Sequence, residues 1–178
     1  MKKNLLFLLL IHIVTNSFSQ KKELFKPGAN IVENTIVSEF NSKSSILFIF
    51  KDDTHLINFY LDLARSIKKQ FRKSKRKVKF NYELFSKKPF ELDLKSMPKK
   101  TFKKVNFDII CYISTTFIGG FDNDITGGRK QNYNLNLRIV ESKKKILLES
   151  AKIKVNSVQT ITTQNINSSK LIYNLITN

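Results

Sequence analysis

An apolar face with helical spacing runs through residues 54–71 and limits the folds open to this chain. Its large apolar side chains recur at steps of three and four residues: Leu56, Tyr60, Leu63, Ile67 and Phe71. This spacing is typical of a helix that packs one face on a core. Asp53 or Thr54 is expected to cap its start, because a side-chain oxygen there can accept a hydrogen bond from the first turn. His55, in that turn, is assigned a structural or solvent-facing role.

Strand patterns stand on both sides of this helix. The short apolar run at 45–50 predicts a buried strand, and residues 78–84 alternate apolar with polar side chains. Residues 107–114 are apolar on both faces apart from Asp108, which predicts a central strand. The stretch 85–106 is expected to be a loop, in which residues 90–94 could add a short edge strand.

The last third of the chain predicts a β-hairpin and a second helix. Residues 132–141 and 146–155 alternate around a tight turn at 142–144. The side chains expected to face the core from the first of these strands are Tyr133, Leu135, Leu137 and Ile139. After a polar stretch at 160–164, Ser168 is expected to open the final helix, whose inner face would carry Leu171, Ile172, Leu175 and Ile176.

This order of elements predicts an α+β fold. We expect a single mixed, mostly antiparallel sheet of about five strands with two helices packed on one face. Residues 46–178 are expected to form this one domain, after a lead-in at 20–45. Within the lead-in, residues 31–40 fit a helix or a strand, and their β-branched content favours a strand.

The first nineteen residues have the three parts of a cleavable secretory signal peptide. Lys2 and Lys3 precede an apolar run at 5–14, and Ser17 and Ser19 supply small side chains before the cleavage point. The apolar run is much shorter than the roughly 20 residues that a membrane-spanning helix needs. We therefore expect an exported protein, periplasmic or secreted. It is not expected to be a lipoprotein, because the only cysteine, Cys111, lies far from the cleavage point.

Positive charge is concentrated in residues 65–104. The chain has 32 Lys and Arg against 14 Asp and Glu, and this segment alone holds sixteen basic and three acidic residues. Its densest part, taken here as a candidate anion-binding surface, contains Lys68, Lys69, Arg72, Lys73, Lys75, Arg76, Lys77 and Lys79. Such a cluster attracts anions and is weakened by salt. Outside the cytoplasm the available polyanions are lipopolysaccharide, anionic lipid head groups, acidic glycans and extracellular DNA. The alternative is a solvated basic surface with no specific partner.

No catalytic, metal or cofactor motif is found in the sequence. A zinc site needs several Cys or His ligands, but after residue 19 the chain has only Cys111 and His55. The loop at 122–127 begins like an EF-hand, yet Tyr133 stands where that calcium site needs a glutamate. Cys111 is expected to be a small buried hydrophobe, and no cofactor is expected. Five carboxylates could still meet in space to form a hydrolytic pair: Asp52, Asp53, Asp108, Asp122 and Asp124.

Three stretches together carry a resemblance to known proteins: the strand at 107–113, the hairpin at 137–149, and the long helix that precedes residues 78–84. Their order is similar to that of small bacterial envelope modules. These include the amino-terminal domain of the Tol–Pal propeller protein, the periplasmic domain of the curli-secretion lipoprotein, and the penicillin-binding-protein activator lipoproteins. The resemblance implies a non-catalytic module that docks other envelope components, and it transfers no functional residues.

Three functions follow as hypotheses. The first is an exported, non-enzymatic envelope module that binds another envelope component, for which a protein is the favoured partner. The second is an electrostatic binder of an anionic polymer (lipopolysaccharide, acidic glycan or extracellular DNA) through residues 65–104. The third is a hydrolase that uses an unrecognised carboxylate pair.

Overall fold

The computed structural model describes residues 28–38, 44–74, 76–85, 100–123, 129–157 and 160–177. In chain order its strands and α-helices are β1 (Gly28–Ile36), β2 (Ile46–Asp53), α2 (Ile57–Phe71), β3 (Val78–Phe85), β4 (Ile109–Asn123), β5 (Arg129–Glu141), β6 (Leu147–Ser157) and α4 (Ile161–Thr177). Three single turns of 3-10 helix are η1 (Thr54–Leu56), η2 (Arg72–Ser74) and η3 (Lys104–Asn106). The predicted signal peptide at 1–19 and the edge strand considered at 90–94 lie outside the described residues.

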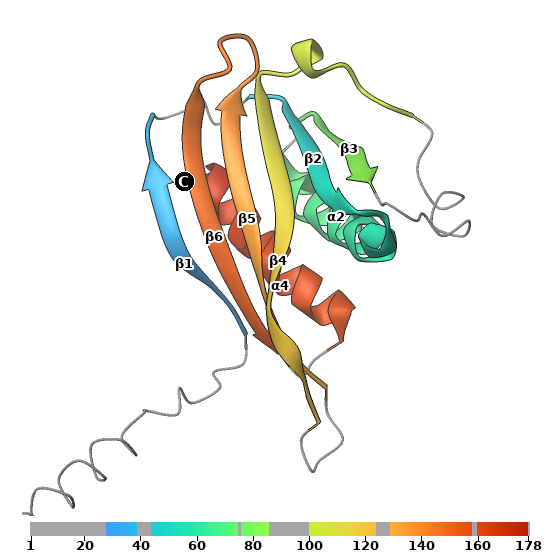
Figure 1. The fold of residues 1–178 in the computed structure, drawn as a ribbon. Helices are drawn as coiled ribbons and strands as arrows, with labels where there is room; N and C mark the ends of the chain where they lie inside the picture. The colour runs from blue at the N-terminus through green and yellow to red at the C-terminus, as the bar shows by residue number, and fades with distance from the viewer. Residues whose placement is uncertain are drawn as a thin grey trace, which may run out of the picture.

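The strands form one mixed sheet with the order β1-β6-β5-β4-β2-β3, and both helices lie on the same face of it (Figure 1). The predicted α+β class with two helices on one face is therefore confirmed. The sheet has six strands rather than five. It is also less antiparallel than expected, because β2 runs parallel to both β3 and β4. For β3 the reason is the helix, because α2 carries the chain back along the sheet so that β3 starts at the same end as β2.

The sixth strand comes from the segment expected as a lead-in. β1 pairs antiparallel with β6 and forms one edge of the sheet. It begins at Gly28, whose φ of 130° is a backbone conformation that favours glycine. Most of β1 is exposed, so it lacks the alternating burial that marks a strand in a sequence. The β-branched residues were the signal that pointed to it.

The main core lies between the sheet and the helices. β2 contributes Ile46, Phe48 and Phe50, all fully buried, and the amphipathic face predicted for α2 packs against them. The prediction for β5 is also confirmed, because Tyr133, Leu135, Leu137 and Ile139 are all buried. Arg138, on the other face of β5, is exposed.

Helix α4 begins at Ile161, seven residues before the predicted start at Ser168. Its first half has a polar inner face, with Gln164, Asn165, Ser168 and Ser169 all buried. The amide of Asn165 donates to the Phe59 carbonyl oxygen at 3.2 Å and to the Asp62 carboxylate at 3.0 Å, both on α2. Hydropathy missed this half of the helix because side-chain hydrogen bonds to α2, rather than apolar contacts, hold it in place.

The opposite face of the sheet, turned toward the viewer in Figure 1, has a smaller core. Leu47, Ile49 and Ile110 are buried there under the segment 100–107, which contributes Phe102 and Phe107. Asn81 on β3 anchors this segment: its amide donates to the Phe102 carbonyl at 2.8 Å and accepts from the Phe102 N–H at 2.9 Å. No other described element covers this face.

Strand β4 is longer than predicted. It continues through Gly119 and Gly120 to Asn123, with irregular pairing to β5 after Phe117. Residues expected to form a loop therefore extend the sheet, and 124–128 of the EF-hand-like stretch lie outside the described residues. Within the described part of the chain, no helix combines the length and apolarity needed to cross a membrane.

Candidate functional site

The carboxyl-terminal end of α2 carries a groove of about 550 Å³, called here the α2 groove. Its lining is mainly basic: Arg65, Lys68, Lys69, Phe71, Arg72, Arg76 and Val78. Arg65, Lys68, Lys69 and Arg72 occupy positions i, i+3, i+4 and i+7 of a helical repeat, so α2 and its η2 extension present them on one side. All four are exposed.

The positive charge of the α2 groove is uncompensated by the described acidic residues. None of Arg65, Lys68, Lys69 and Arg72 forms an ion pair with any of them. Like charges four residues apart on a helix repel each other. Arg76 is more tightly held, because its guanidinium donates to the Ile176 carbonyl at 3.2 Å and partial burial lowers its pKa. An anion in the groove would relieve the repulsion.

The structure places six of the eight predicted site residues and divides them between two faces of the sheet. Lys68, Lys69, Arg72 and Arg76 meet in the α2 groove. On the other face, the Lys77 ammonium lies 4.9 Å from the centre of the Phe107 ring, and that of Lys79 lies 5.4 Å from the Phe102 ring. Lys75 and the side chain of Lys73 lie outside what is described. The sequence analysis missed Arg65, although its helical spacing with Lys68, Lys69 and Arg72 was a usable signal.

A second, larger groove of about 880 Å³ lies on the face of the sheet opposite the helices and is called here the sheet-face groove. Its lining includes Lys51, Lys104, Ile110, Tyr112, Ser114, Asn136, Arg138, Val140, Glu141 and Lys145. The ammonium groups of Lys51 and Lys104 lie 5.2 and 5.4 Å from the centre of the Tyr112 ring. Sequence reasoning missed this groove because its residues come from β2, η3, β4, β5 and the turn after β5, and form no local motif.

Glu83 on β3 holds the two lysines of this groove in place. Its carboxylate pairs with Lys104 at 2.9 Å and with Lys51 at 3.7 Å. The hydrogen bond from Lys104 to Glu83 raises the pKa of Lys104, so that side chain stays charged at neutral pH. The positions of both ammonium groups are thus set before any ligand arrives.

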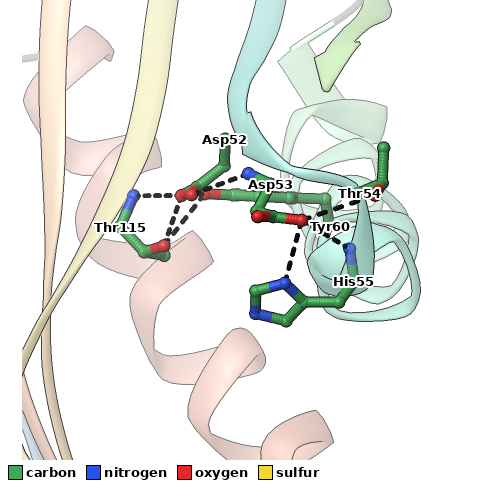
Figure 2. Close-up of polar contacts among 6 residues, drawn as sticks. All are labelled: Asp52, Asp53, Thr54, His55, Tyr60 and Thr115. Atoms are coloured by element: carbon green, nitrogen blue, oxygen red, sulfur yellow. Dashed lines mark hydrogen bonds and ion pairs between the residues drawn. The ribbon is translucent and has the colours of Figure 1, made fainter. Parts of the chain in front are cut away.

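Polar contacts gather at the carboxyl end of β2 around Asp52 (Figure 2). Its Oδ2 accepts from the Tyr60 hydroxyl at 2.5 Å, from the Thr115 N–H at 2.8 Å and from the Thr115 hydroxyl. Burial, with the adjacent Asp52 carboxylate, raises the pKa of Tyr60, which keeps its hydroxyl protonated as a donor. Asp52 therefore ties β2 to α2 and to β4.

Asp53 faces the other way and caps η1, the turn that leads into α2, as predicted for one of the two candidate residues. Its Oδ1 accepts from the His55 N–H at 3.2 Å and lies 2.9 Å from His55 Nδ1 (Figure 2). The hydrogen bond from the His55 side chain lowers the pKa of Asp53. The His55 side chain is 68% exposed, in agreement with the solvent-facing role expected for it.

Asp108 lies at the opposite end of β2 from Asp52. Its Oδ2 accepts from the Ser45 N–H at 2.7 Å and from the Ser45 hydroxyl at 2.8 Å. Asp52, Asp53 and Asp108 thus each have their own partners and do not converge. Asp124 lies outside the described residues, as does the side chain of Asp122.

The Asp108–Ser45 contact predicts a pH-dependent contribution to stability. Hydrogen bonds from the Ser45 N–H and hydroxyl lower the pKa of Asp108 in the folded chain. Its contribution is therefore present above the unfolded value of about 4 and is lost as the pH falls through the lower folded value. We expect Asp108→Ala to reduce the free energy of unfolding by about 1 kcal/mol near neutral pH. Urea unfolding should show this gap closing in acid; a gap that stays constant would contradict the assignment.

Cys111 is fully buried within β4. Burial, together with the nearby charge of Glu149, raises the pKa of its thiol. The prediction of a small buried hydrophobe is confirmed. In the described ranges, no three His, Cys, Asp or Glu side chains are grouped closely enough to hold a metal ion.

Comparison with known proteins identifies a fold and no family. No protein-family model matches the sequence, and no curated protein matches it significantly. Among solved structures, the PelC dodecamer from Paraburkholderia phytofirmans is 8% identical with a TM-score of 0.52, over 84% of this chain and 99% of that chain. A single-substitution variant of the same protein is 5% identical with a TM-score of 0.50, over 83% and 96%. A lipoprotein from Neisseria meningitidis is 12% identical with a TM-score of 0.40, over 74% and 97%.

At these identities a structural likeness is informative about architecture alone. None of the three envelope families that the sequence pattern resembles is confirmed by these comparisons. What the likeness to PelC shows is that the two chains share a fold, in which one mixed sheet carries its helices on a single face.

Proposed function

We propose that this chain is an exported, non-enzymatic module of the bacterial envelope, and that it binds an anionic polymer through the α2 groove. The observation that carries the proposal is the convergence of Arg65, Lys68, Lys69, Arg72 and Arg76 on one groove. A groove lined by a single sign of charge raises the local concentration of ions of the opposite sign.

The composition of the α2 groove favours recognition of charge over recognition of bases. Its one aromatic residue, Phe71, is 2% exposed and packs edge-on against Phe48 and Tyr173 in the core. Binding of single-stranded nucleic acid usually requires aromatic faces on which bases can stack. The α2 groove is therefore suited to bind the negatively charged groups of a polymer, irrespective of the chemical nature of its repeating units.

The carboxylates of the described residues support a non-enzymatic role. A catalytic pair needs two carboxyl groups that face a common substrate position. Asp52 is engaged by Tyr60 and Thr115, whereas Asp108, at the other end of β2, is engaged by Ser45. Both have a structural task that accounts for their positions.

The test is a charge reversal in the α2 groove. We expect Lys68→Glu combined with Arg72→Glu to weaken binding to polygalacturonate, lipopolysaccharide micelles or duplex DNA by about tenfold or more. With fewer cations in the groove, binding releases fewer counterions from the polymer. The affinity of the exported chain should be measured at several salt concentrations. The variant should also show a shallower dependence of affinity on salt.

Lys143→Glu combined with Lys170→Glu is the matched control. It changes the net charge by the same amount, and neither residue lines either groove. We expect this control to retain most of the binding. Equal losses of affinity in both variants would mean that overall charge, rather than the α2 groove, accounts for binding. No loss of affinity in the α2 variant would overturn the proposal.

A second candidate function is docking of a protein along β1, with another copy of this chain as the partner. β1 forms one edge of the sheet, and edge strands present unpaired backbone groups to other chains. Three apolar side chains on or just after this edge are well exposed: Val32 at 48%, Ile36 at 66% and Val37 at 58%. The PelC structure that shares this fold is a dodecamer.

Assembly along β1 predicts that the exported chain is larger than a monomer in solution. We expect Val32→Lys combined with Ile36→Lys to reduce the mass measured by light scattering to that of one chain, because charges on an edge strand oppose pairing between edges. Lys170→Glu, on α4, serves as a control. A wild-type chain that is monomeric at high concentration would contradict assembly through this edge.

A further inference from the structure

The sheet-face groove lies on the opposite side of the sheet from the α2 groove. Its volume of about 880 Å³ falls in the range of pockets that hold extended small ligands. The segment that carries Lys104 forms one side of the groove, and the turn that carries Lys145 lies at its end.

Positive charge dominates this groove. Four basic side chains line it (Lys51, Lys104, Arg138 and Lys145), against the single acid Glu141, which pairs with Lys144 at 3.4 Å. Arg138 and Lys145 are exposed and form no ion pair with any described acidic residue. The guanidinium of Arg138 is therefore available for a two-pronged hydrogen bond to a carboxylate or phosphate.

The floor of the groove argues against nucleic acid as its occupant. Tyr112 on β4 lies directly across from Arg138 on β5. The ammonium groups of Lys51 and Lys104 lie near its ring, at the cation–π distances given above, and Glu83 restrains both. Because these cations lie against the ring, Tyr112 offers no clear platform for a base to stack on.

The other lining residues suit a sugar. Val105, which is 71% exposed, provides apolar surface, and Ser114 and Asn136 provide neutral hydrogen-bonding groups. The Asn136 amide donates to the Thr116 hydroxyl at 2.8 Å, which leaves its carbonyl oxygen and a second N–H for a ligand. An exposed apolar side chain, neutral polar groups and flanking cations match the C–H surface, hydroxyls and carboxylate of a uronic acid.

We propose that the sheet-face groove binds a uronate segment of an acidic polysaccharide, with its carboxylate held by Arg138 and Lys145. The sugar would lie along the groove, with its apolar C–H surface toward Val105 and its hydroxyls toward Ser114 and Asn136. This inference rests on the proposed function, in that the ligand is an anionic polymer, and adds the class of that polymer and a second contact surface. A chain in contact with both grooves would pass around the edge that β3 forms.

The test is calorimetric titration of the exported chain with trigalacturonate, a short uronate probe. The variant combines Arg138→Gln with Lys145→Asn; asparagine suits the left-handed backbone of Lys145, whose φ is 57°. We expect the variant to lose about tenfold or more in affinity for the probe, as removal of charge-assisted hydrogen bonds implies. Arg138→Gln alone should give part of this loss, and thermal unfolding should show that both variants fold.

Two further probes decide the class of ligand. The methyl ester of trigalacturonate keeps the sugars and lacks the charge, so it should bind much more weakly than the acid. A trithymidylate oligonucleotide should bind more weakly than trigalacturonate and respond little to the variant. Equal binding of the ester, or stronger binding of the oligonucleotide, would overturn the proposal.

The α2 variant separates this inference from the proposed function. Lys68→Glu combined with Arg72→Glu should leave the affinity for trigalacturonate within about twofold, since neither residue lines the sheet-face groove. If that variant loses the long polymer while the Arg138 and Lys145 variant binds trigalacturonate normally, the proposed function stands and this inference fails. The reverse result would locate the binding in the sheet-face groove alone.

Discussion

Replacing Phe50 by alanine is expected to lower the free energy of unfolding by about 3–5 kcal/mol. Phe50 is fully buried in β2, and its ring centre lies 4.8 Å from that of Tyr60, 5.3 Å from Tyr82 and 6.2 Å from Phe80. These rings belong to α2 and β3, so the cavity would open where the helix packs on the parallel part of the sheet. Because three elements share it, the site has little freedom to collapse. Urea unfolding followed by circular dichroism would measure the change.

Phe85→Ala is the matched control for this substitution. The same side chain is removed at the end of β3, where Phe85 is 72% exposed, so a change of no more than about 0.5 kcal/mol is expected. Phe50→Leu should fall between the two, since leucine refills part of the volume. A loss below about 1 kcal/mol for Phe50→Ala would mean that the aromatic cluster is not packed as described.

Replacing Asp52 by alanine is expected to cost about 2–4 kcal/mol, because it removes one acceptor and leaves several donors without a partner. Its carboxylate accepts from the hydroxyls of Tyr60 and Thr115 and from the Thr115 N–H. The Tyr60 ring is fully buried, so its hydroxyl cannot turn to water without moving the helix. Equilibrium unfolding of the variant would measure the loss.

Its neighbour Asp53 provides the comparison. Asp53 caps η1 and its side chain is 43% exposed, so Asp53→Ala, which removes only this cap, should cost clearly less than Asp52→Ala. A double-mutant cycle with Tyr60→Phe should show coupling to Asp52 and none to Asp53. Equal effects of the two aspartate substitutions would contradict the role assigned to Asp52.

Periodicity in the sequence was sufficient where burial is one-sided and apolar. The face from Leu56 to Phe71 identified α2, and alternation identified β5 with its inward residues from Tyr133 to Ile139. Periodicity failed where a helix or strand is held in place by hydrogen bonds rather than by burial of apolar side chains. The first half of α4 is buried through hydrogen bonds of Asn165 to α2, and β1 is a strand because it pairs with β6, whatever its exposure.

The candidate sites likewise include features that local sequence patterns predict and features that they do not. Local charge density pointed to residues 65–104, and helical spacing is enough to group Lys68, Lys69 and Arg72 on one side of α2. It could not show that Lys77 and Lys79 point to the other face of the sheet. That separation arises because the chain turns from helix to strand between Arg72 and Val78, and in a strand successive side chains alternate between faces.

Patterns along the chain are sufficient to predict the α+β class, the main helix, the hairpin and the excess of positive charge, because each depends on residues within a few positions of one another. The parallel neighbours of β2, the separation of Asp52 from Asp108, and the sheet-face groove around Tyr112 become visible only in the folded molecule. These features bring together residues that are tens of positions apart, such as Lys51, Lys104 and Arg138. Their proximity follows from strand order and register, which hydropathy and spacing along one chain do not encode.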